Sequence, residues 1–379
     1  MGDFTRVTVK SNDFVRGWHL IEGAVLKAVA RVGSSGWYIL GEEVRRFEAA
    51  LAAAWPVPHA VGVGSGLDGL EIALRCLGLR RGDRVLTTPL SAFATTLAIV
   101  RVGGTPVFVD VDDSGLLDLD RCREALRHDR TIRWLLPVHL YGHALDLEAL
   151  ADLQAEFGLG VVEDCAQSIG ARSRGRTTGT VARAAATSFY PTKNLGALGD
   201  AGAVLTAEAT VAEEARALRH YGQTSTYVHD RLGLNSRLDE LHAAILHDAL
   251  LPHLQDWTAR RSAIAAAYRD GISHPRLTVP PIPAGSESVW HLFPVLAAPP
   301  ERSAFIAHLN AGGVQTGVHY PRLIPCQRAL AEHGGFEVIG ETANAERFAR
   351  GEVSLPIHPF LADAEVAQVV ACCNAWRPA

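Results

Sequence analysis

The stretch Val161–Gln167 (VVEDCAQ) decides the fold, because apolar residues run directly into a pair of acids. A short apolar run of this kind predicts a strand covered on both faces, and the acids mark its carboxyl end. In an open α/β sheet, ligands bind in the crevice at the carboxyl ends of the strands. Asp164 is therefore a candidate for chemistry, with a helix N-cap as the ordinary alternative for an aspartate at this place.

On both sides of this stretch, from about residue 60 to 206, short β-type runs alternate with helical ones. Such alternation predicts an α/β fold with a mostly parallel sheet flanked by helices. The expected strands are Ala60–Val63, Arg84–Thr88, Pro106–Asp110, Trp134–Leu140, Leu159–Asp164, Thr187–Tyr190 and Ala203–Thr206. The expected helices between them are Leu67–Leu77, Ala92–Val102, Leu119–Arg127 and Leu147–Phe157.

The flanking regions predict helices before the sheet and a second, smaller unit after it. A Pro- and Gly-rich stretch, Val279–Ser288, precedes a short α+β pattern. We therefore expect a large domain over residues 1–255 and a small C-terminal α+β domain over residues 256–379 that includes a long connecting helix. The further expected elements are helices near Trp18–Val32, Glu42–Ala53, Leu238–Ala249, Asp256–Tyr268 and Arg302–Ala311, a strand at Val289–Val295 and a closing helix that ends near Ala375.

Composition excludes several classes of protein. The chain of 379 residues carries 36 basic and 41 acidic residues, a net charge of -5, with no basic stripe, so no nucleic-acid partner is expected. No apolar run approaches the ~18 residues of a membrane span, and the N-terminus lacks the apolar core of a signal peptide, so we expect a cytoplasmic protein without membrane contact. The six cysteines are scattered without paired CxxC motifs, and no metal site is expected.

A glycine-rich turn lies at Val63–Leu70 (VGSGLDGL), between an expected strand and an expected helix. Its glycines match the GxGxxG pattern of nicotinamide dinucleotide folds, but that pattern also needs an acid at the end of the next strand. The next strand, Arg84–Thr88, is followed by Pro89 and Leu90 instead, which argues against a nicotinamide oxidoreductase. Backbone N–H groups at such a turn suit a phosphate, and a tight turn without a ligand is the alternative.

A lone lysine follows a third strand end, in Ser188–Asn194 (SFYPTKN). The chain uses arginine almost everywhere else for positive charge, and its other lysines, Lys10 and Lys27, lie near the N-terminus. A phosphate cradle, an acid and an isolated lysine at strand ends of one sheet suggest pyridoxal phosphate (PLP). That cofactor needs a lysine to bind it covalently, an acid at its pyridine nitrogen and donors for its phosphate. An ordinary surface lysine is the alternative.

Taken in order along the chain, these motifs resemble the DegT/StrS group of nucleotide-sugar aminotransferases, which belongs to the aspartate-aminotransferase superfamily and has PLP fold type I. The resemblance runs from about Gly33 to Pro356. It is carried by Ser35–Gly41 (SGWYILG), Ser65–Leu70, Pro137–Gly142 (PVHLYG), Glu163–Ala171 (EDCAQSIGA), Ser188–Asn194, Gly199–Gly202 (GDAG), Gly233–Glu240 (GLNSRLDE) and His319–Pro321 (HYP).

There are two departures from the family pattern. Leu67 and Gly69 stand where the family usually has threonine and alanine, so a threonine hydroxyl is missing from the turn. Ile169 stands where many members have histidine.

The resemblance implies roles for individual residues. The expected catalytic residues are Lys193, which would bind PLP covalently, and Asp164, which would pair with the pyridine nitrogen. Further cofactor contacts are expected from Phe93 stacked on the ring, Gln167 near the ring hydroxyl, and the backbone of Gly66 and Leu67 and the hydroxyl of Ser188 at the phosphate. Asn235, with Arg237, would reach that phosphate from the neighbouring subunit of a homodimer with shared sites. The expected contacts to the nucleotide sugar are Tyr38, His319 and Tyr320.

The activity that the resemblance implies is transfer of an amino group from L-glutamate to a keto-sugar nucleotide, with PLP cycling through pyridoxamine phosphate. The motif SGWYILGEEV, the turn variant and Arg219–Gly222 resemble members that aminate C3 of a dTDP-3-keto-6-deoxyhexose, for antibiotic glycosides or surface polysaccharides. A C4 aminotransferase on a dTDP-4-keto-6-deoxyhexose is the first alternative. An inosose aminotransferase and a non-catalytic regulatory relative are the others. Lys193 argues against the regulatory reading and against the dehydratase relatives, in which histidine replaces the lysine.

Overall fold

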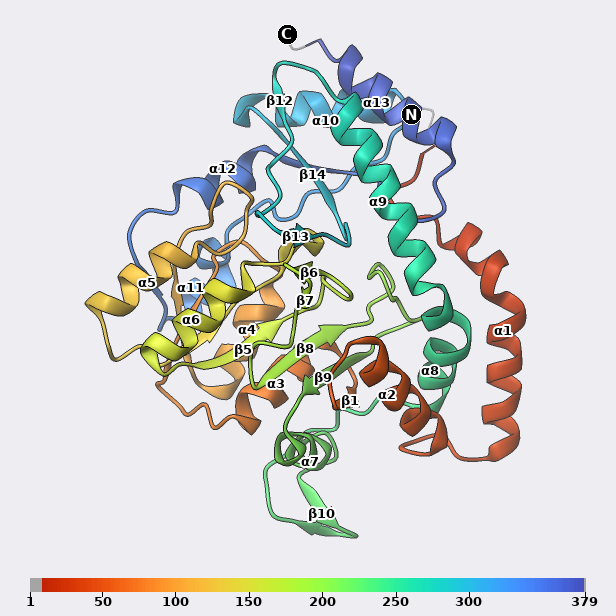
Figure 1. Ribbon diagram of the computed structural model, residues 1–379, viewed down its shortest axis with the longest axis vertical. Helices are drawn as coiled ribbons and strands as arrows, with labels where there is room; N and C mark the ends of the chain where they lie inside the picture. The colour runs from red at the N-terminus through yellow and green to blue at the C-terminus, as the bar shows by residue number, and fades with distance from the viewer. Residues whose placement is uncertain (1–8, 378–379) are drawn as a thin grey trace.

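An eight-stranded sheet forms the centre of the computed structural model, which describes residues 9–377 (Figure 1). Strand β9 is antiparallel to both its neighbours, and the pairs from β8 across to β15 are all parallel. The expected mostly parallel α/β sheet is therefore confirmed. From one edge to the other, the strands are β1 (His59–Val63), β9 (Gly202–Thr206), β8 (Ala184–Ser188), β5 (Gly160–Asp164), β4 (Trp134–Leu136), β2 (Arg84–Thr87), β3 (Thr105–Phe108) and β15 (Glu337–Val338).

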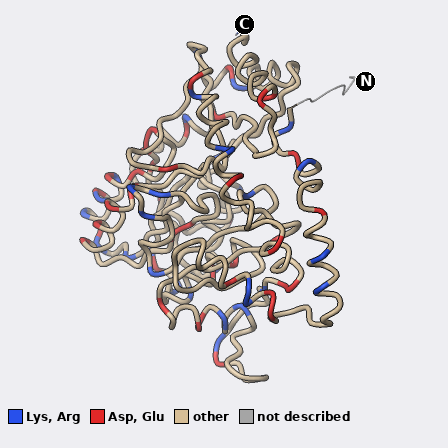
Figure 2. Tube along the Cα trace, turned by 45° about the vertical axis from the view of Figure 1, so that its right-hand side comes forward, with Lys and Arg blue, Asp and Glu red and all other residues tan. Residues whose placement is uncertain are grey.

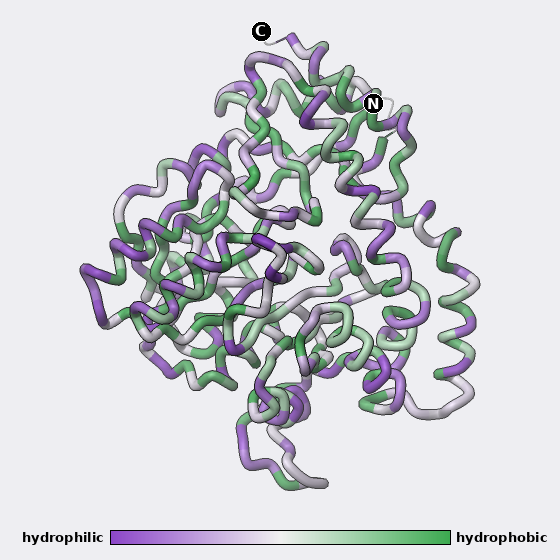
Figure 3. Tube along the Cα trace, in the orientation of Figure 1, coloured by the Kyte–Doolittle hydropathy of each residue, from purple (hydrophilic) through white to green (hydrophobic). Residues whose placement is uncertain are grey.

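Helices cover both faces of this sheet because its side chains alternate between them. Val85 and Val162 pack on one face with α3, α4 and α7, and their neighbours Leu86 and Val161 pack on the other with α5 and α6. Apolar and polar stretches alternate along the trace (Figure 3). The helices are α3 (Gly66–Cys76), α4 (Phe93–Val102), α5 (Leu119–His128), α6 (Leu147–Phe157) and α7 (Ala209–Leu218), with α1 (Phe14–Ser35), α2 (Glu42–Ala54) and α8 (Glu240–Ile245) packed together beside β1.

The C-terminal region forms a second core above the sheet (Figure 1). One of its segments returns to the large sheet, since β15 pairs with β3 at the sheet edge. The division of domains at residue 256 stays a prediction. The elements of this region are α9 (Leu254–Gly271), the antiparallel strands β12 (Leu277–Thr278), β14 (Phe293–Ala297) and β16 (Glu352–Leu355), and the helices α10 (Arg302–Ala311), α11 (Arg328–His333), α12 (Ala343–Gly351) and α13 (Asp363–Ala375). The remaining strands are β6 (Arg172–Ser173), β7 (Arg176–Thr177) and β13 (Ser286–Glu287), and the hairpin of β10 (Gln223–Ser225) and β11 (Val228–His229).

Three expected strands differ most from the structure in their bounds, and the others differ by one or two residues at one or both ends. The strand expected at Trp134–Leu140 ends at Leu136, because Pro137 has no N–H to donate and a 3-10 turn begins at Leu140. The strand expected at Thr187–Tyr190 is Ala184–Ser188, so Tyr190 lies beyond the sheet. The strand expected at Val289–Val295 begins only at Phe293, because Trp290 adopts a left-handed backbone conformation with φ of 50°.

Charged residues of both signs are interspersed along the chain in the view of Figure 2. Across residues 9–377, none of the helices combines the length and the apolar character that crossing a membrane requires.

Candidate active site

β1 and β8 end on either side of β9, and their ends together form a small cradle. Val63 and Ser188 are both in register with Gly202 of the intervening β9, so the turn after β1 lies against Ser188. The approach is close enough that a Cβ on Gly66 would lie 2.7 Å from the Cβ of Ser188. Ser65 caps α3 by accepting a hydrogen bond from the Asp68 amide at 3.1 Å. The cradle thus offers a helix N-terminus and a hydroxyl, which suits a phosphate. It brings together Gly66, the first turn of α3 with Leu67, and Ser188, and their binding of a phosphate stays a prediction.

Asp164 ends β5 and is buried at the same edge of the sheet. Its Oδ2 accepts a hydrogen bond from Thr95 Oγ1 at 2.8 Å, and its Oδ1 accepts one from the Ala166 amide at 3.0 Å. Burial raises the pKa of Asp164, and these two donors and the charge of Lys193 oppose that rise. A cation placed against this carboxylate would therefore stabilise its charged form.

Lys193 lies in the loop after β8 and faces the same region, because its charge and that of Asp164 act on each other. Burial lowers the pKa of Lys193 to about 8, although Asp164 opposes that shift. An amine with such a pKa is partly neutral near neutral pH and is therefore available as a nucleophile. The loop is tight, since the Lys193 amide donates to the Tyr190 carbonyl at 2.8 Å and a Cβ on Gly196 would lie 2.3 Å from the Pro191 carbonyl oxygen.

Gln167 and Tyr320 join the acid-bearing loop to the C-terminal region. The Tyr141 amide donates to Gln167 Oε1 at 2.7 Å, and Gln167 Nε2 donates to the hydroxyl of Tyr320 at 3.4 Å. The hydroxyl of Tyr141 in turn donates to the His319 carbonyl at 2.9 Å. The structure therefore brings Gln167, His319 and Tyr320 together, and their contacts to a cofactor or a sugar nucleotide stay predictions.

A buried carboxylate, Glu352, lies behind His319. Its oxygens accept hydrogen bonds from the His319 amide at 2.6 Å and from Ser354 Oγ, and Ser354 Oγ lies 2.8 Å from Nδ1 of His319. Burial raises the pKa of Glu352 to about 8 against the opposing effect of these donors and of Arg302. Burial and the charge of Lys193 lower the pKa of His319 to about 4, so its ring is neutral at physiological pH.

Phe93 begins α4 directly after β2 and is partly buried beside Phe108 and Ile324. Its stacking on a cofactor ring stays a prediction, although its position at the carboxyl edge of the sheet is compatible with it.

Tyr38, Asn235 and Arg237 form a separate group. The Glu240 amide donates to the Tyr38 carbonyl at 3.0 Å, which places the loop of Tyr38 beside the segment of Asn235 and Arg237. Tyr38 is 58% exposed, Asn235 is exposed, and Arg237 Nη1 lies 3.2 Å from Nδ1 of His220 in the same chain. The resemblance assigns Tyr38, like His319 and Tyr320, to the sugar, and it assigns Asn235 and Arg237 to a neighbouring subunit's site.

The sequence did not reveal several supporting residues. Thr95, Glu352 and Ser354 act through buried hydrogen bonds between segments far apart in the chain, and no local spacing indicates them. His139 and Glu163 were visible only as parts of longer motifs. His139 Nε2 lies 2.9 Å from Glu163 Oε2, and Glu163 also accepts from the amides of Gly179, Val181 and Ala182. These buried hydrogen bonds fix the position of the loop after β5.

Comparison with known proteins defines the class of this site. Residues 20–374 match the DegT/DnrJ/EryC1/StrS aminotransferase family. The chain therefore belongs to this family of aminotransferases.

Relatives of known structure agree with this assignment. The chain is 44% identical over 351 residues to dTDP-3-amino-3,4,6-trideoxy-alpha-D-glucose transaminase of Streptomyces venezuelae, covering 92% of this chain and 91% of the relative. The X-ray structure of S. venezuelae DesV in complex with a ketimine intermediate superposes with a TM-score of 0.91 at 42% identity, covering 96% of this chain and 97% of that one. NtdA from Bacillus subtilis with bound cofactor PMP has a TM-score of 0.86 at 27% identity, covering 98% of this chain and 86% of that one.

We predict that Thr95→Val lowers the rate of amine transfer by about tenfold, because Asp164 loses a buried donor to its charged form. The matched control is Thr96→Val, since Thr96 is equally buried and its hydroxyl has no hydrogen-bond partner among residues 9–377. Steady-state kcat/KM for both variants provides the measurement. Equal losses in the two variants would show that packing in α4, and not the bond to Asp164, matters.

We also predict that Glu352→Gln changes how stability depends on pH. The pKa of Glu352 in the folded protein, about 8, lies above its ordinary value of 4.5. The protonated carboxyl therefore favours the folded state below pH 4.5, and this contribution is lost as pH rises to about 8. The variant should escape this loss, which amounts to at most about 1.4 kcal/mol per pH unit.

Thermal unfolding between pH 5 and pH 9 measures the effect, with the exposed Glu346→Gln on α12 as the control. The Tm of Glu352→Gln relative to that of the unchanged protein should increase with pH, and the control should follow the unchanged protein. A constant difference in Tm across this range would contradict the raised pKa of Glu352.

Proposed function

We propose that the chain is a PLP-dependent aminotransferase that transfers the amino group of L-glutamate to C3 of a dTDP-3-keto-6-deoxyhexose in the cytoplasm. The observation that carries the proposal is the meeting of Lys193, Asp164 and the Gly66–Ser188 cradle at one edge of the sheet. The 44% identity to a transaminase named for a 3-amino sugar nucleotide supports the choice of carbon.

The residues present fit PLP by their chemistry. Gly66 has no Cβ, which leaves the cradle open where a phosphate would approach. Asp164 would hold the proton of the pyridine nitrogen, and Lys193 provides the amine. The cofactor would supply an electron sink for charge that develops at the substrate carbon. With a pKa of about 8, Nζ of Lys193 can both accept and release a proton near neutral pH, as transfer of a proton between two carbons requires.

His319 and Tyr320 support a polar, neutral wall for the sugar nucleotide. His319 is held by Ser354 and Glu352, and Tyr320 is held by Gln167 beside the acid-bearing loop. Their positions orient a substrate across the edge of the sheet, between the α/β body and the C-terminal region.

The experiment that tests this proposal offers the purified enzyme dTDP-3-keto- and dTDP-4-keto-6-deoxyhexoses with L-glutamate and identifies the amino sugar by mass spectrometry and NMR. We expect the 3-amino sugar and an equal amount of 2-oxoglutarate. Lys193→Ala should reduce product at least 1,000-fold, because neither amine capture nor proton transfer remains, while Lys27→Ala should match the unchanged enzyme. Amination of the 4-keto sugar alone would overturn the choice of carbon, and full activity of Lys193→Ala would overturn the mechanism.

We also propose a homodimer with shared sites. Two exposed apolar segments flank the stretch that holds Asn235 and Arg237: one is Trp37–Ile39, and the other is the β10–β11 hairpin with Tyr227 and Val228, which projects from the body (Figure 1). Clustered apolar exposure of this kind marks an interaction surface. Burial of these segments against a second copy would place Asn235 and Arg237 at the neighbour's phosphate cradle.

A mixing experiment tests this arrangement. Chains with Lys193→Ala and chains with both Asn235→Ala and Arg237→Ala are each expected to be inactive. Heterodimers should regain one intact site in two, or about half the activity of the unchanged dimer. If heterodimers are shown to form and remain inactive, the sites are not shared in this way.

A further inference from the structure

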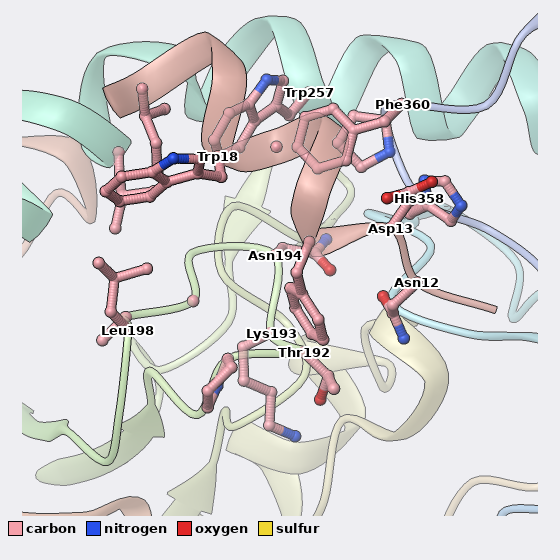
Figure 4. Close-up of a pocket in the computed structure, with 18 of the residues that line it drawn as sticks. Asn12, Asp13, Trp18, Thr192, Lys193, Asn194, Leu198, Trp257, His358 and Phe360 are labelled. Carbon is pink, nitrogen blue, oxygen red and sulfur yellow. The ribbon is translucent and has the colours of Figure 1, made fainter. Parts of the chain in front are cut away.

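A cavity of about 270 Å³ lies beside the loop that carries Lys193 (Figure 4). Its wall is largely aromatic and comes from α1, α9 and the segment before α13, with Trp18, Trp257 and Phe360. The loop from Pro191 to Leu198 forms the opposite wall, and the amine of Lys193 points away from the aromatic side chains (Figure 4). The site described above uses none of the aromatic residues of this cavity.

A buried cation, Arg261, lines the cavity, and its guanidinium forms no ion pair with an acid within residues 9–377. Arg261 is 4% exposed, and its Nη1 donates to the carbonyls of Ile357 and Trp290, the latter at 3.3 Å. Its Nε has no hydrogen-bond partner among residues 9–377. Burial lowers the pKa of Arg261 to about 10, and the side chain still carries its charge at neutral pH. A buried charge that lacks a counter-ion is costly, and an anion in the cavity would remove this cost.

His358 supplies a second unsatisfied group in the same cavity. It is 2% exposed, its Nε2 lies 3.1 Å from the Lys10 carbonyl oxygen, and its Nδ1 has no partner among the described residues. Burial and the charge of Arg261 lower the pKa of His358 to about 4, so the ring is neutral. Since Nε2 must then carry the proton that it donates to the carbonyl, Nδ1 is an acceptor that needs a donor.

The carboxylate of Asp13 also lines the cavity, together with the polar residues Asn12, Thr192, Lys193 and Asn194. It caps α1 by accepting from the Arg16 amide at 3.1 Å and lies 3.4 Å from the Lys10 ammonium. Both charges act on the ring of His358, since Arg261 lowers its pKa and Asp13 raises it. The cavity therefore offers a cation, a neutral acceptor and an anion beside an aromatic wall.

We propose that this cavity binds an α-amino acid with an apolar side chain. The carboxylate of the ligand pairs with Arg261, its ammonium donates to Nδ1 of His358 on the side of Asp13, and its side chain packs against Trp18, Trp257 and Phe360. A sugar nucleotide lacks this combination of charges and apolar surface, and the aromatic wall offers no charged partner for the second carboxylate of glutamate. Lys193 lines the cavity with its amine pointing away from the aromatic wall, so the proposed site adjoins the Lys193 centre.

Isothermal titration of the purified holoenzyme with L-phenylalanine tests the proposal. We expect saturable binding that L-phenylalaninamide, without the carboxylate, and 3-phenylpropionate, without the ammonium, each reproduce only weakly. Arg261→Gln should weaken binding of L-phenylalanine by ~10–100-fold, since a charge-assisted contact is lost. The matched control is Arg260→Gln on the same helix, whose guanidinium pairs with Asp363 and the Leu361 carbonyl instead. It should bind L-phenylalanine as the unchanged protein does.

A second variant keeps the test decisive if Arg261→Gln fails to fold. Leu198 lies at the margin of the cavity and is 49% exposed, so Leu198→Trp should fold and fill the space. It should abolish the heat of L-phenylalanine binding and leave the binding of L-glutamate at the Lys193 centre measurable. Absence of binding to the unchanged protein, equal binding of the amide, or full binding in Leu198→Trp would each overturn the proposal.

Discussion

The register of three strands at Gly202 is the constraint on which the site depends. Val63 of β1 and Ser188 of β8 each pair with Gly202 of β9, which lies between them. Backbone hydrogen bonds therefore fix the end of β1 relative to the end of β8. A side chain at Gly66 would collide with Ser188, and one at Gly202 would lie 2.5 Å from the backbone of Ser65. A shift of one residue in the pairing of β8 with β9 would turn the side chain of Ser188 to the opposite face and remove it from the cradle.

Burial then sets the chemistry of the groups that this register brings together. Asp164 and Lys193 are each shifted toward their neutral forms by burial, and each opposes the shift of the other. The same low-dielectric region keeps His319 neutral and raises the pKa of Glu352, so the side of the site formed by the C-terminal region carries little charge. The ionisable groups Asp164 and Lys193 therefore lie at the strand ends of the large sheet, and the neutral recognition groups lie opposite them in the C-terminal region.

The sequence could predict those parts of the molecule that depend on local pattern. Apolar runs followed by turn residues located the strands that end at Asp164 and at the glycine turn, and a lone lysine in an arginine-rich chain indicated Lys193. Local pattern could not locate the end of the strand before Lys193, because that end depends on pairing with β9 and not on the apolar run through Phe189. Nor could it find Thr95 or Glu352, whose roles come from hydrogen bonds to Asp164 and His319 across long sequence separations. The same limit applies to Arg261, which looks like any other helical arginine until its lack of a counter-ion is seen in three dimensions.

Arg260 and Arg261 show how one helix can use adjacent arginines in different ways. Arg260 is partly exposed, and its charge is shared by Asp363 at the start of α13 and by the carbonyl of Leu361 just before that helix, while water screens the rest. Arg261, one residue on, points inward and has only carbonyl oxygens as acceptors. Those carbonyls belong to the segments of Trp290 and Ile357, so the guanidinium holds together the two chain segments that border the C-terminal side of the site. Replacing it with an apolar residue would leave both carbonyls unpaired, whereas an arginine satisfies them and leaves Nε free. The structural role thus accounts for the side chain's burial but not for its unbalanced charge, and that remaining charge makes the neighbouring cavity selective for an anionic group.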